Sequence, residues 1–322
     1  LAVDGQSAPG VWKRSGTRML LRARQPLAQL EIRDSLSGDG LFYAPFVDRT
    51  KQFGTIRTMN WANTNEPVQV RWSSRTTPGW YTQADREVCW EYQIAIAEAC
   101  DSNLWICVHH TADDEYVRSL AKLFKKEWDG TRRLFLEHSN EVWNWAFPQA
   151  RYAYDRSPAT RNPTEYHMKR TAEIARIFRE EGVEVTSVLG AQSVAARDFR
   201  WIVDQVPLPA DIDAAAHAPY FAYQSTDRSS VEAVLDQCAT SIKDVGEQIK
   251  AWKSVCDEMG LELTAYEGGQ HLAATPAEQN DASIVNLYVA ANRHPRMYDL
   301  HRDYLGQWNQ LTDRAVLCLF NS

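Results

Sequence analysis

Short apolar runs alternate with longer segments of helical periodicity along almost the whole chain. An apolar run bounded by turn residues is typical of a strand buried on both faces, and an alternating run is typical of a half-buried strand. Residues 28–36 alternate, whereas the later runs are mostly apolar. The expected strands are residues 28–36, 54–61, 103–110, 134–136, 183–193, 212–223, 261–271 and 315–321.

Helical patterns fill the intervals between these runs. They cover residues 45–53, 83–100, 113–128, 162–181, 229–259 and 275–312, the last interrupted near His294 and Pro295. Strands that alternate with helices predict a parallel sheet. Eight strands favour an α/β fold of the (β/α)₈ TIM-barrel class in a single domain, with an open doubly wound sheet as the alternative. No GxGxxG motif follows the early strands, which argues against dinucleotide binding.

The two ends of the chain differ from its middle. We expect residues 1–27 to be an N-terminal lead-in, in which Met19–Ala23 is either a strand or a segment that plugs the barrel base. Residues 28–322 should form the catalytic barrel without its last helix, because the chain stops directly after the eighth strand. The chain begins at Leu1 without a signal-like segment. We therefore expect the natural protein to extend beyond both ends and to carry flanking domains.

Composition excludes several classes of function. A length of 322 residues suits one large barrel or two ordinary domains. The net charge of −7 argues against a nucleic-acid partner. No apolar run approaches the roughly 20 residues of a membrane span. The six cysteines form no CxxC pair and lack zinc-site spacing, so we expect neither a metal nor a cofactor.

The most informative stretch is RRLFLEHSNEVWNW, from Arg132 to Trp145. Its apolar strand turns abruptly polar, and buried polar groups are costly unless they are paired or used. Polar residues at the carboxyl end of a barrel strand predict an active site. A second such glutamate, Glu267, follows Tyr266 and precedes two glycines, which would leave room for a sugar.

Glu141 and Glu267 are 126 residues apart, about three βα units, which places them on strands four and seven. In a barrel these two strand ends face one another across the top. Cleavage of a glycosidic bond needs two carboxyl groups that flank one bond. The spacing therefore predicts a pair of carboxylates suited to glycoside hydrolysis.

SNEVWN and YEGG, in this strand order, resemble the clan A glycoside hydrolases, which are retaining (β/α)₈ enzymes, and in particular the cellulase-like members. The resemblance covers Arg57 to Asn321. It implies that Glu141 is the general acid/base and Glu267 the nucleophile. It also implies that Arg57 and Tyr220 support the nucleophile, and that a strand-three histidine belongs to the site. That histidine is His109 or His110.

One position departs from the family pattern. Many clan A enzymes carry a tryptophan at the end of strand eight as a sugar platform, whereas this chain has Phe320 and Asn321. The subsite that this tryptophan would form is therefore in doubt.

Elementary electrostatics agrees with the implied roles. An acid/base needs a raised pKa, which an apolar wall and a nearby anion would supply to Glu141. Trp143 is the expected wall and Glu267 the expected anion. Asn140 would hold the 2-hydroxyl of the reacting sugar. The full set of expected substrate-binding residues is Arg57, Trp61, His109, His110, Asn140, Trp143, Tyr220 and His271.

Each assignment has a structural alternative. Glu141 could cap a helix, Glu267 could be a loop carboxylate, and Tyr220 could belong to the core. Arg57 could pair with Glu137, a role compatible with support of the nucleophile. The tryptophans could pack in the core rather than bind sugar; they are Trp61, Trp80, Trp143 and Trp145.

The sequence thus predicts a retaining glycoside hydrolase that cleaves β-linked polysaccharide or oligosaccharide by double displacement. The long loop of residues 63–81 favours endo action. The resemblance implies a secreted or periplasmic location. The alternative function is a non-catalytic carbohydrate-binding barrel. A metal-dependent hydrolase built on His109, His110 and Asp113 is disfavoured, because the first strand has no HxH motif.

Overall fold

The computed structural model describes residues 10–15, 18–23, 40–67, 70–222 and 227–320, and the chain divides into two compact units, Leu1–Phe53 and Gly54–Ser322. In the first unit β1 (Gly10–Ser15) pairs antiparallel with β2 (Arg18–Ala23). Helix α1 (Ala44–Thr50) follows them. Met19–Ala23 is therefore a strand. The expected first barrel strand and the expected domain boundary after residue 27 both lie outside the described residues. Both stay predictions.

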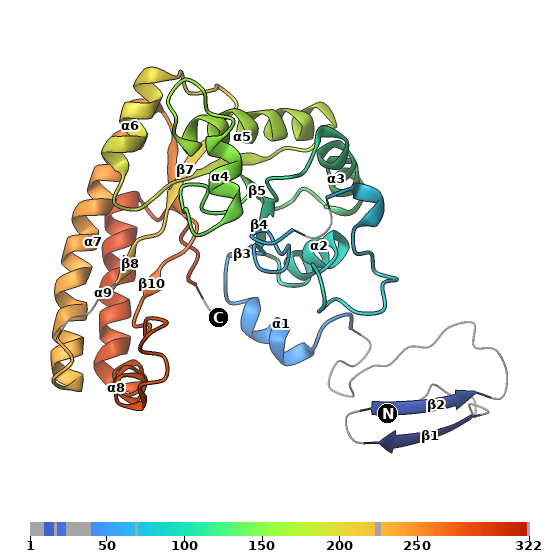
Figure 1. Cartoon of the computed structure of the whole chain (residues 1–322), viewed down its shortest axis with the longest axis horizontal. Helices are drawn as coiled ribbons and strands as arrows, with labels where there is room; N and C mark the ends of the chain where they lie inside the picture. The colour runs from blue at the N-terminus through green and yellow to red at the C-terminus, as the bar shows by residue number, and fades with distance from the viewer. Residues whose placement is uncertain (1–9, 16–17, 24–39, 68–69, 223–226, 321–322) are drawn as a thin grey trace. The chain divides into compact units, whose positions relative to one another are not determined.

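The second unit is built on one parallel sheet with the strand order β3-β4-β5-β6-β7-β9 (Figure 1). Helices alternate with these strands along the chain, which confirms the α/β fold of the (β/α)₈ class. Each apolar run between residues 54 and 271 supplies one strand of the sheet. The strands are β3 (Thr55–Arg57), β4 (Asn103–Val108), β5 (Leu134–His138), β6 (Thr186–Gly190), β7 (Ala214–His217) and β9 (Glu262–Ala265).

Most of the expected strands are shorter than the sequence pattern suggests, and three of them break or do not form a regular strand. The runs 212–223 and 261–271 each break, and their second parts form a separate parallel pair, β8 (Tyr220–Phe221) and β10 (Gly269–Gln270). Residues 315–320 make only an isolated bridge, between Leu317 and Ala265. The expected eighth strand is therefore wrong in extent: Ala265 exchanges backbone hydrogen bonds with Val316 and Cys318, and the next bond, from the Phe320 amide to the Gly268 carbonyl, lies beyond the end of β9.

The helices confirm most of the predicted segments, and several begin at a side-chain cap. The Asp113 carboxylate accepts a hydrogen bond from the Tyr116 amide, and Asn162 caps its helix in the same way. Gly260 ends its helix with a φ of 69°. The bounds are α2 (Trp90–Ala99), α3 (Asp114–Glu127), α4 (Pro148–Tyr154), α5 (Pro163–Glu180), α6 (Ala196–Gln205), α7 (Val231–Met259), α8 (Ala282–Arg293) and α9 (Pro295–Thr312), with a 3₁₀ turn, η1, at Trp72–Ser74.

Two helical predictions need correction. Helix α2 begins at Trp90 rather than at Gln83, because the Gln83 side chain accepts the Cys89 amide and holds the preceding segment in an irregular conformation. Helices α4 and α6 were not predicted. The interruption near His294 is confirmed, since the His294 ring accepts the Arg296 amide and starts a new helix, α9.

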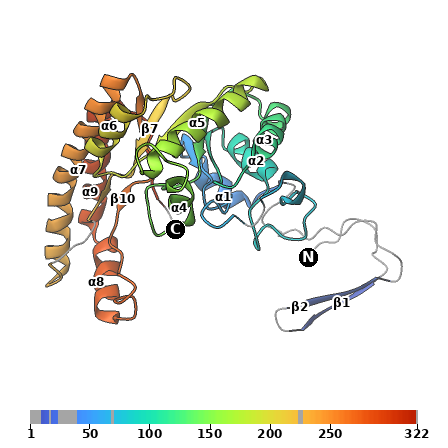
Figure 2. The same ribbon diagram turned by 45° about the horizontal axis from the view of Figure 1, so that its top comes forward.

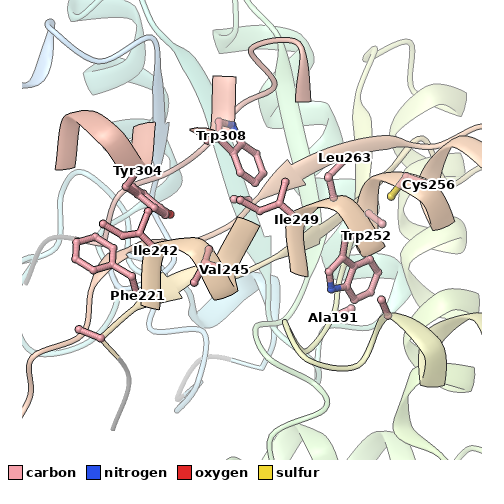
Figure 3. Packing of buried hydrophobic residues seen from close by; sticks show 14 of the residues in the cluster. Ala191, Phe221, Ile242, Val245, Ile249, Trp252, Cys256, Leu263, Tyr304 and Trp308 are labelled. Atoms are coloured by element: carbon pink, nitrogen blue, oxygen red, sulfur yellow. The ribbon is translucent and has the colours of Figure 1, made fainter. Parts of the chain in front are cut away.

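The largest core cluster lies where α7 and α9 pack side by side, as both views show (Figures 1 and 2). Trp252 of α7 and Trp308 of α9 are buried there together with Ile249 and Leu263 (Figure 3). Removal of a buried tryptophan side chain typically costs about 3–5 kcal/mol, so this cluster anchors the carboxyl-terminal half of the unit. A second cluster, which includes Trp105, Phe135 and Tyr266, carries the site.

All six cysteines are free thiols. Cys107 is buried, as expected for a core thiol, whereas Cys318 is half-buried. Among the described helices none is long and apolar enough to cross a membrane.

Candidate active site

The backbone bends sharply directly after β5, where the polar residues begin. Ser139 and Glu141 have φ values of 60° and 42°, in the left-handed region that non-glycine residues rarely adopt. Such a conformation persists only where the surroundings fix it. Here the buried Gln149 amide donates to the Asn140 carbonyl at 2.7 Å. The bend directs the Glu141 side chain away from the line of the strand.

Glu141 and Glu267 line the same pocket, which has a volume of about 580 Å³. The pocket opens beside the carboxyl ends of the strands, where the polar segments after β5, β7 and β9 meet. Its lining residues are Met59, Asn60, Asn65, Asn140, Glu141, Phe147, Tyr220, Glu267, Gln270, His271, Leu272, Ala273 and Phe320.

The Glu267 carboxylate is held by two donors on separate strands. Arg57 Nη1 donates to its Oε1 at 3.0 Å, and the Tyr220 hydroxyl donates to its Oε2 at 2.9 Å. The side chains of Arg57 and Glu267 are 6% and 12% exposed, so water screens this ion pair weakly. These two contacts fix the orientation of the Glu267 carboxylate in the pocket.

The surroundings of Glu141 favour the protonated form of its carboxyl group. Burial raises its pKa, and the charge of Glu267 raises it further, although hydrogen bonds from Asn144 and Tyr266 oppose both effects. These bonds run from Asn144 Nδ2 at 2.9 Å and from the Tyr266 hydroxyl at 3.2 Å. The residues lining the pocket do not include Trp143, which the sequence suggested as the wall. A carboxyl group in this setting can hold a proton and donate it.

Arg57 makes both of the contacts expected for it, with Glu267 and with Glu137. Besides Glu267, its guanidinium binds Glu137 through Nε at 3.1 Å and Nη2 at 2.8 Å. Nη2 also donates to Asn140 Oδ1 at 2.9 Å, and Asn140 Nδ2 donates to Asn65 at 3.1 Å. Asn140 lies in the pocket lining as expected. Its contact with a sugar 2-hydroxyl stays a prediction.

His271 lines the pocket and meets the Tyr220 ring edge-on, with centroids 5.2 Å apart. Three of the residues expected to bind substrate from strands two and three, Trp61, His109 and His110, are not among the lining residues. Both histidines are buried, and burial lowers the pKa of each to about 4, so they are neutral near pH 7.

The two histidines contact half-buried neighbours instead. His109 Nδ1 lies 2.9 Å from the Thr111 hydroxyl, and the His110 ring packs edge-on against Tyr152. Asp113 caps α3. Within the described ranges no group of three or more His, Cys, Asp or Glu side chains is placed to hold a metal ion.

The two side chains that donate hydrogen bonds to Glu141, Tyr266 and Asn144, escaped the sequence reasoning, as did several lining residues. Tyr266 bonds Glu141, and the Arg57 guanidinium lies over its ring at 5.2 Å from the centroid. The signal available was its place beside Glu267, but strand alternation would have sent it to the opposite face. Alternation fails because β9 ends at Ala265.

The end of the predicted eighth strand also contributes to the pocket. Phe320 lines it and meets the Tyr220 ring edge-on at 6.4 Å between centroids. An aromatic ring from the end of the predicted eighth strand therefore lines the pocket.

No protein-family model and no curated protein sequence matches this chain. Among solved structures, the crystal structure of the GH51 arabinofuranosidase from Xanthomonas axonopodis pv. citri is similar, with a TM-score of 0.50 at 11% identity. That likeness covers 89% of this chain, which spans 62% of the length of the arabinofuranosidase chain. A GH5-4 broad specificity endoglucanase from an uncultured bacterium has a TM-score of 0.48 at 13% identity, over 90% of this chain and 81% of its own. At such identities the first likeness concerns the fold, and the second is weaker still.

Proposed function

We propose that the chain is a retaining glycoside hydrolase, with Glu267 as the nucleophile and Glu141 as the general acid/base. The observation that carries this proposal is the contrast between two carboxyl groups in one pocket. Glu267 is paired with Arg57, whereas burial and the charge of Glu267 raise the pKa of Glu141. Double displacement at an acetal requires one carboxylate that is positioned to attack and a second carboxyl group that can hold and donate a proton.

In the first step a Glu267 oxygen attacks the anomeric carbon while Glu141 gives its proton to the departing glycosidic oxygen. The bond to the leaving group breaks, and a glycosyl ester with Glu267 forms. In the second step the Glu141 carboxylate takes a proton from a water molecule, whose oxygen attacks the anomeric carbon and releases Glu267. Both residues then return to their starting protonation states.

The proposed substrate is a β-linked polysaccharide or oligosaccharide. Phe147, Tyr220 and Phe320 supply aromatic rings to the pocket lining, and such rings stack on the apolar faces of sugars. Endo action is the finer part of the proposal, and the size distribution of early products from a long chain tests it. The secreted or periplasmic location stays a prediction.

The test is hydrolysis of a panel of β-linked polysaccharides and aryl glycosides by the wild type, Glu267→Ala and Glu141→Ala, each with and without azide. Azide should rescue Glu267→Ala and give a glycosyl azide of inverted configuration, because it replaces the lost nucleophile. It should rescue Glu141→Ala with a product of retained configuration, because it attacks the glycosyl-enzyme ester.

Full activity of either alanine variant would refute the assignment of that residue. Binding of a sugar without cleavage by the wild type would favour the alternative, a non-catalytic carbohydrate-binding barrel. Isothermal titration with the same panel distinguishes that result from a chain that binds no carbohydrate.

A further inference from the structure

A fully buried carboxylate that takes no part in the proposed chemistry lies next to the pocket residues. Glu137, on β5, has 0% exposure and directs Oε2 at several donors. That oxygen accepts Arg57 Nε and Nη2, the Trp105 indole N–H at 2.9 Å and the Cys107 thiol at 3.3 Å. Glu137 Oε1 is buried without a hydrogen-bond partner.

Stability alone does not account for this ion pair. Removing two charges from water costs several kcal/mol per ion, and their attraction in the interior often only offsets that cost. Burial raises the pKa of Glu137 although Arg57 opposes the shift, which reflects the same cost. One acceptor atom of Glu137 is also left unsatisfied.

The geometry gives Glu137 a different task. Guanidinium is planar and rigid, so fixing Nε and Nη2 also fixes the direction of Nη1. Nη1 is the atom that binds Glu267, and Nη2 also binds Asn140. We propose that Glu137 is a positioning residue that anchors Arg57 and thereby sets the places of Glu267 and Asn140 in the pocket. Its catalytic consequence rests on the proposed glycosidase function.

Gly190, at the end of β6, makes room for this anchor. A Cβ at position 190 would lie 3.0 Å from Glu137 Oε1, closer than ordinary van der Waals contact. Gly190→Ala should therefore push the carboxylate by a few tenths of an ångström without removing any charge. It provides a second variant that tests position rather than charge.

The test is a double-mutant cycle measured as kcat and KM on an aryl glycoside. As a single substitution, Glu137→Gln should lower kcat by about tenfold or more and change KM much less. The reason is that it misplaces Arg57, and with it Glu267, which acts in the chemical step. In an Arg57→Met background the same change should cost less than about twofold, because the anchor then has nothing to hold. Gly190→Ala should lower kcat by a few-fold.

Glu165→Gln is the matched control. Glu165 is also fully buried and paired, but its partners are Lys169 and Thr160 rather than Arg57. The Glu165→Gln variant should be less stable than the wild type and should keep the wild-type kcat. Equal losses of kcat from Glu137→Gln in the two backgrounds, or an equal loss from Glu165→Gln, would assign Glu137 a merely structural role and overturn the proposal.

A readout that needs no activity separates this inference from the proposed function. In crystals of Glu137→Gln, or of Gly190→Ala if the first variant does not fold, Arg57 Nη1 should move out of hydrogen-bond reach of Glu267 Oε1. An unchanged separation of 3.0 Å would overturn the positioning role. Movement of Arg57 in a protein that cleaves no glycoside would leave the positioning role standing and refute the glycosidase.

Discussion

Replacement of Gly268 by alanine should strain the backbone next to the proposed nucleophile. A Cβ at this position would lie 2.5 Å from the Tyr304 hydroxyl oxygen, with Leu317 and Pro219 atoms at 3.7 Å. Tyr304 is fully buried, and its ring packs against Phe221 with centroids 5.2 Å apart. The hydroxyl therefore has no free space into which it can swing.

The size of the clash sets the expected magnitude. Ordinary van der Waals contact begins at 3.4 Å, so the 2.5 Å separation falls short by about 0.9 Å. Either the Tyr304 ring or the backbone that carries Glu267 must give way. Forced overpacking of this kind costs about 1–3 kcal/mol. Because a displacement of about 1 Å at a reacting group can cost about 100-fold, we also expect kcat to fall between tenfold and that limit.

Urea unfolding of the wild type, Gly268→Ala, Tyr304→Phe and the double variant measures the effect. Tyr304→Phe removes the clashing oxygen and keeps the ring, so the double variant should recover most of the loss, with a coupling free energy of about 1 kcal/mol or more. Gly306→Ala in α9 is the control, because its Cβ meets open space and alanine favours a helix by about 1 kcal/mol. A Gly268→Ala variant with the unfolding free energy of the wild type would refute the reasoning, as would a loss that Tyr304→Phe does not relieve.

Three further predictions concern titration and hydrogen bonding. Burial and the charge of Glu267 raise the pKa of Glu141, so this pKa should fall in Glu267→Gln. Carboxyl ¹³C NMR measures the titration midpoint of Glu141, and an unchanged midpoint would contradict an effect of the Glu267 charge. Tyr220→Phe removes a donor from Glu267 and should lower kcat about tenfold, which corresponds to the loss of about 1.4 kcal/mol; wild-type kcat would argue against this contact in the transition state. Burial lowers the pKa of His217 from 6.5 to about 3. Between these two pH values the unfolded chain therefore binds a proton at His217 that the folded chain does not. The stability due to this residue is complete above 6.5 and should fall by about 1.4 kcal/mol per pH unit below it. Urea unfolding at about pH 5 and about pH 7 should show a shallower pH slope in His217→Gln, and equal slopes would refute this.

The sequence by itself determined the order of the strands of the parallel sheet and, to within a few residues, where each strand begins. Strands β4 to β7 and β9 are buried along almost their whole length, so their apolar runs stand out locally, whereas β3 is half-buried. Asp113 and Gly260 act on backbone groups within a few residues of themselves, and so their roles can also be inferred from sequence. The order of the strands along the chain was enough to place Glu141 and Glu267 at one end of the fold.

Only the tertiary structure decided which side chains share the pocket. Trp61 and His109 come after strands of the sheet, and Tyr220 comes shortly after β7. Of these three residues only Tyr220 lines the pocket. The difference depends on the breaks after β7 and β9, where backbone pairing between β8 and β10 redirects the chain. A local pattern does not encode such a break, because it depends on partners far away in sequence.

The ion pair and hydrogen bonds of the site also depend on residues that are far apart in sequence. Arg57 and Glu267 are 210 residues apart, and Tyr266 reaches Glu141 across 125 residues. Sequence pattern identified both glutamates as candidates, and the family resemblance added Arg57, but both missed the Tyr266 hydroxyl as a hydrogen-bond donor to Glu141. Residue type and strand order predict which groups are available at the strand ends. Their hydrogen-bond partners and protonation are set by burial and by distances of about 3 Å, which arise only when the strands are packed together.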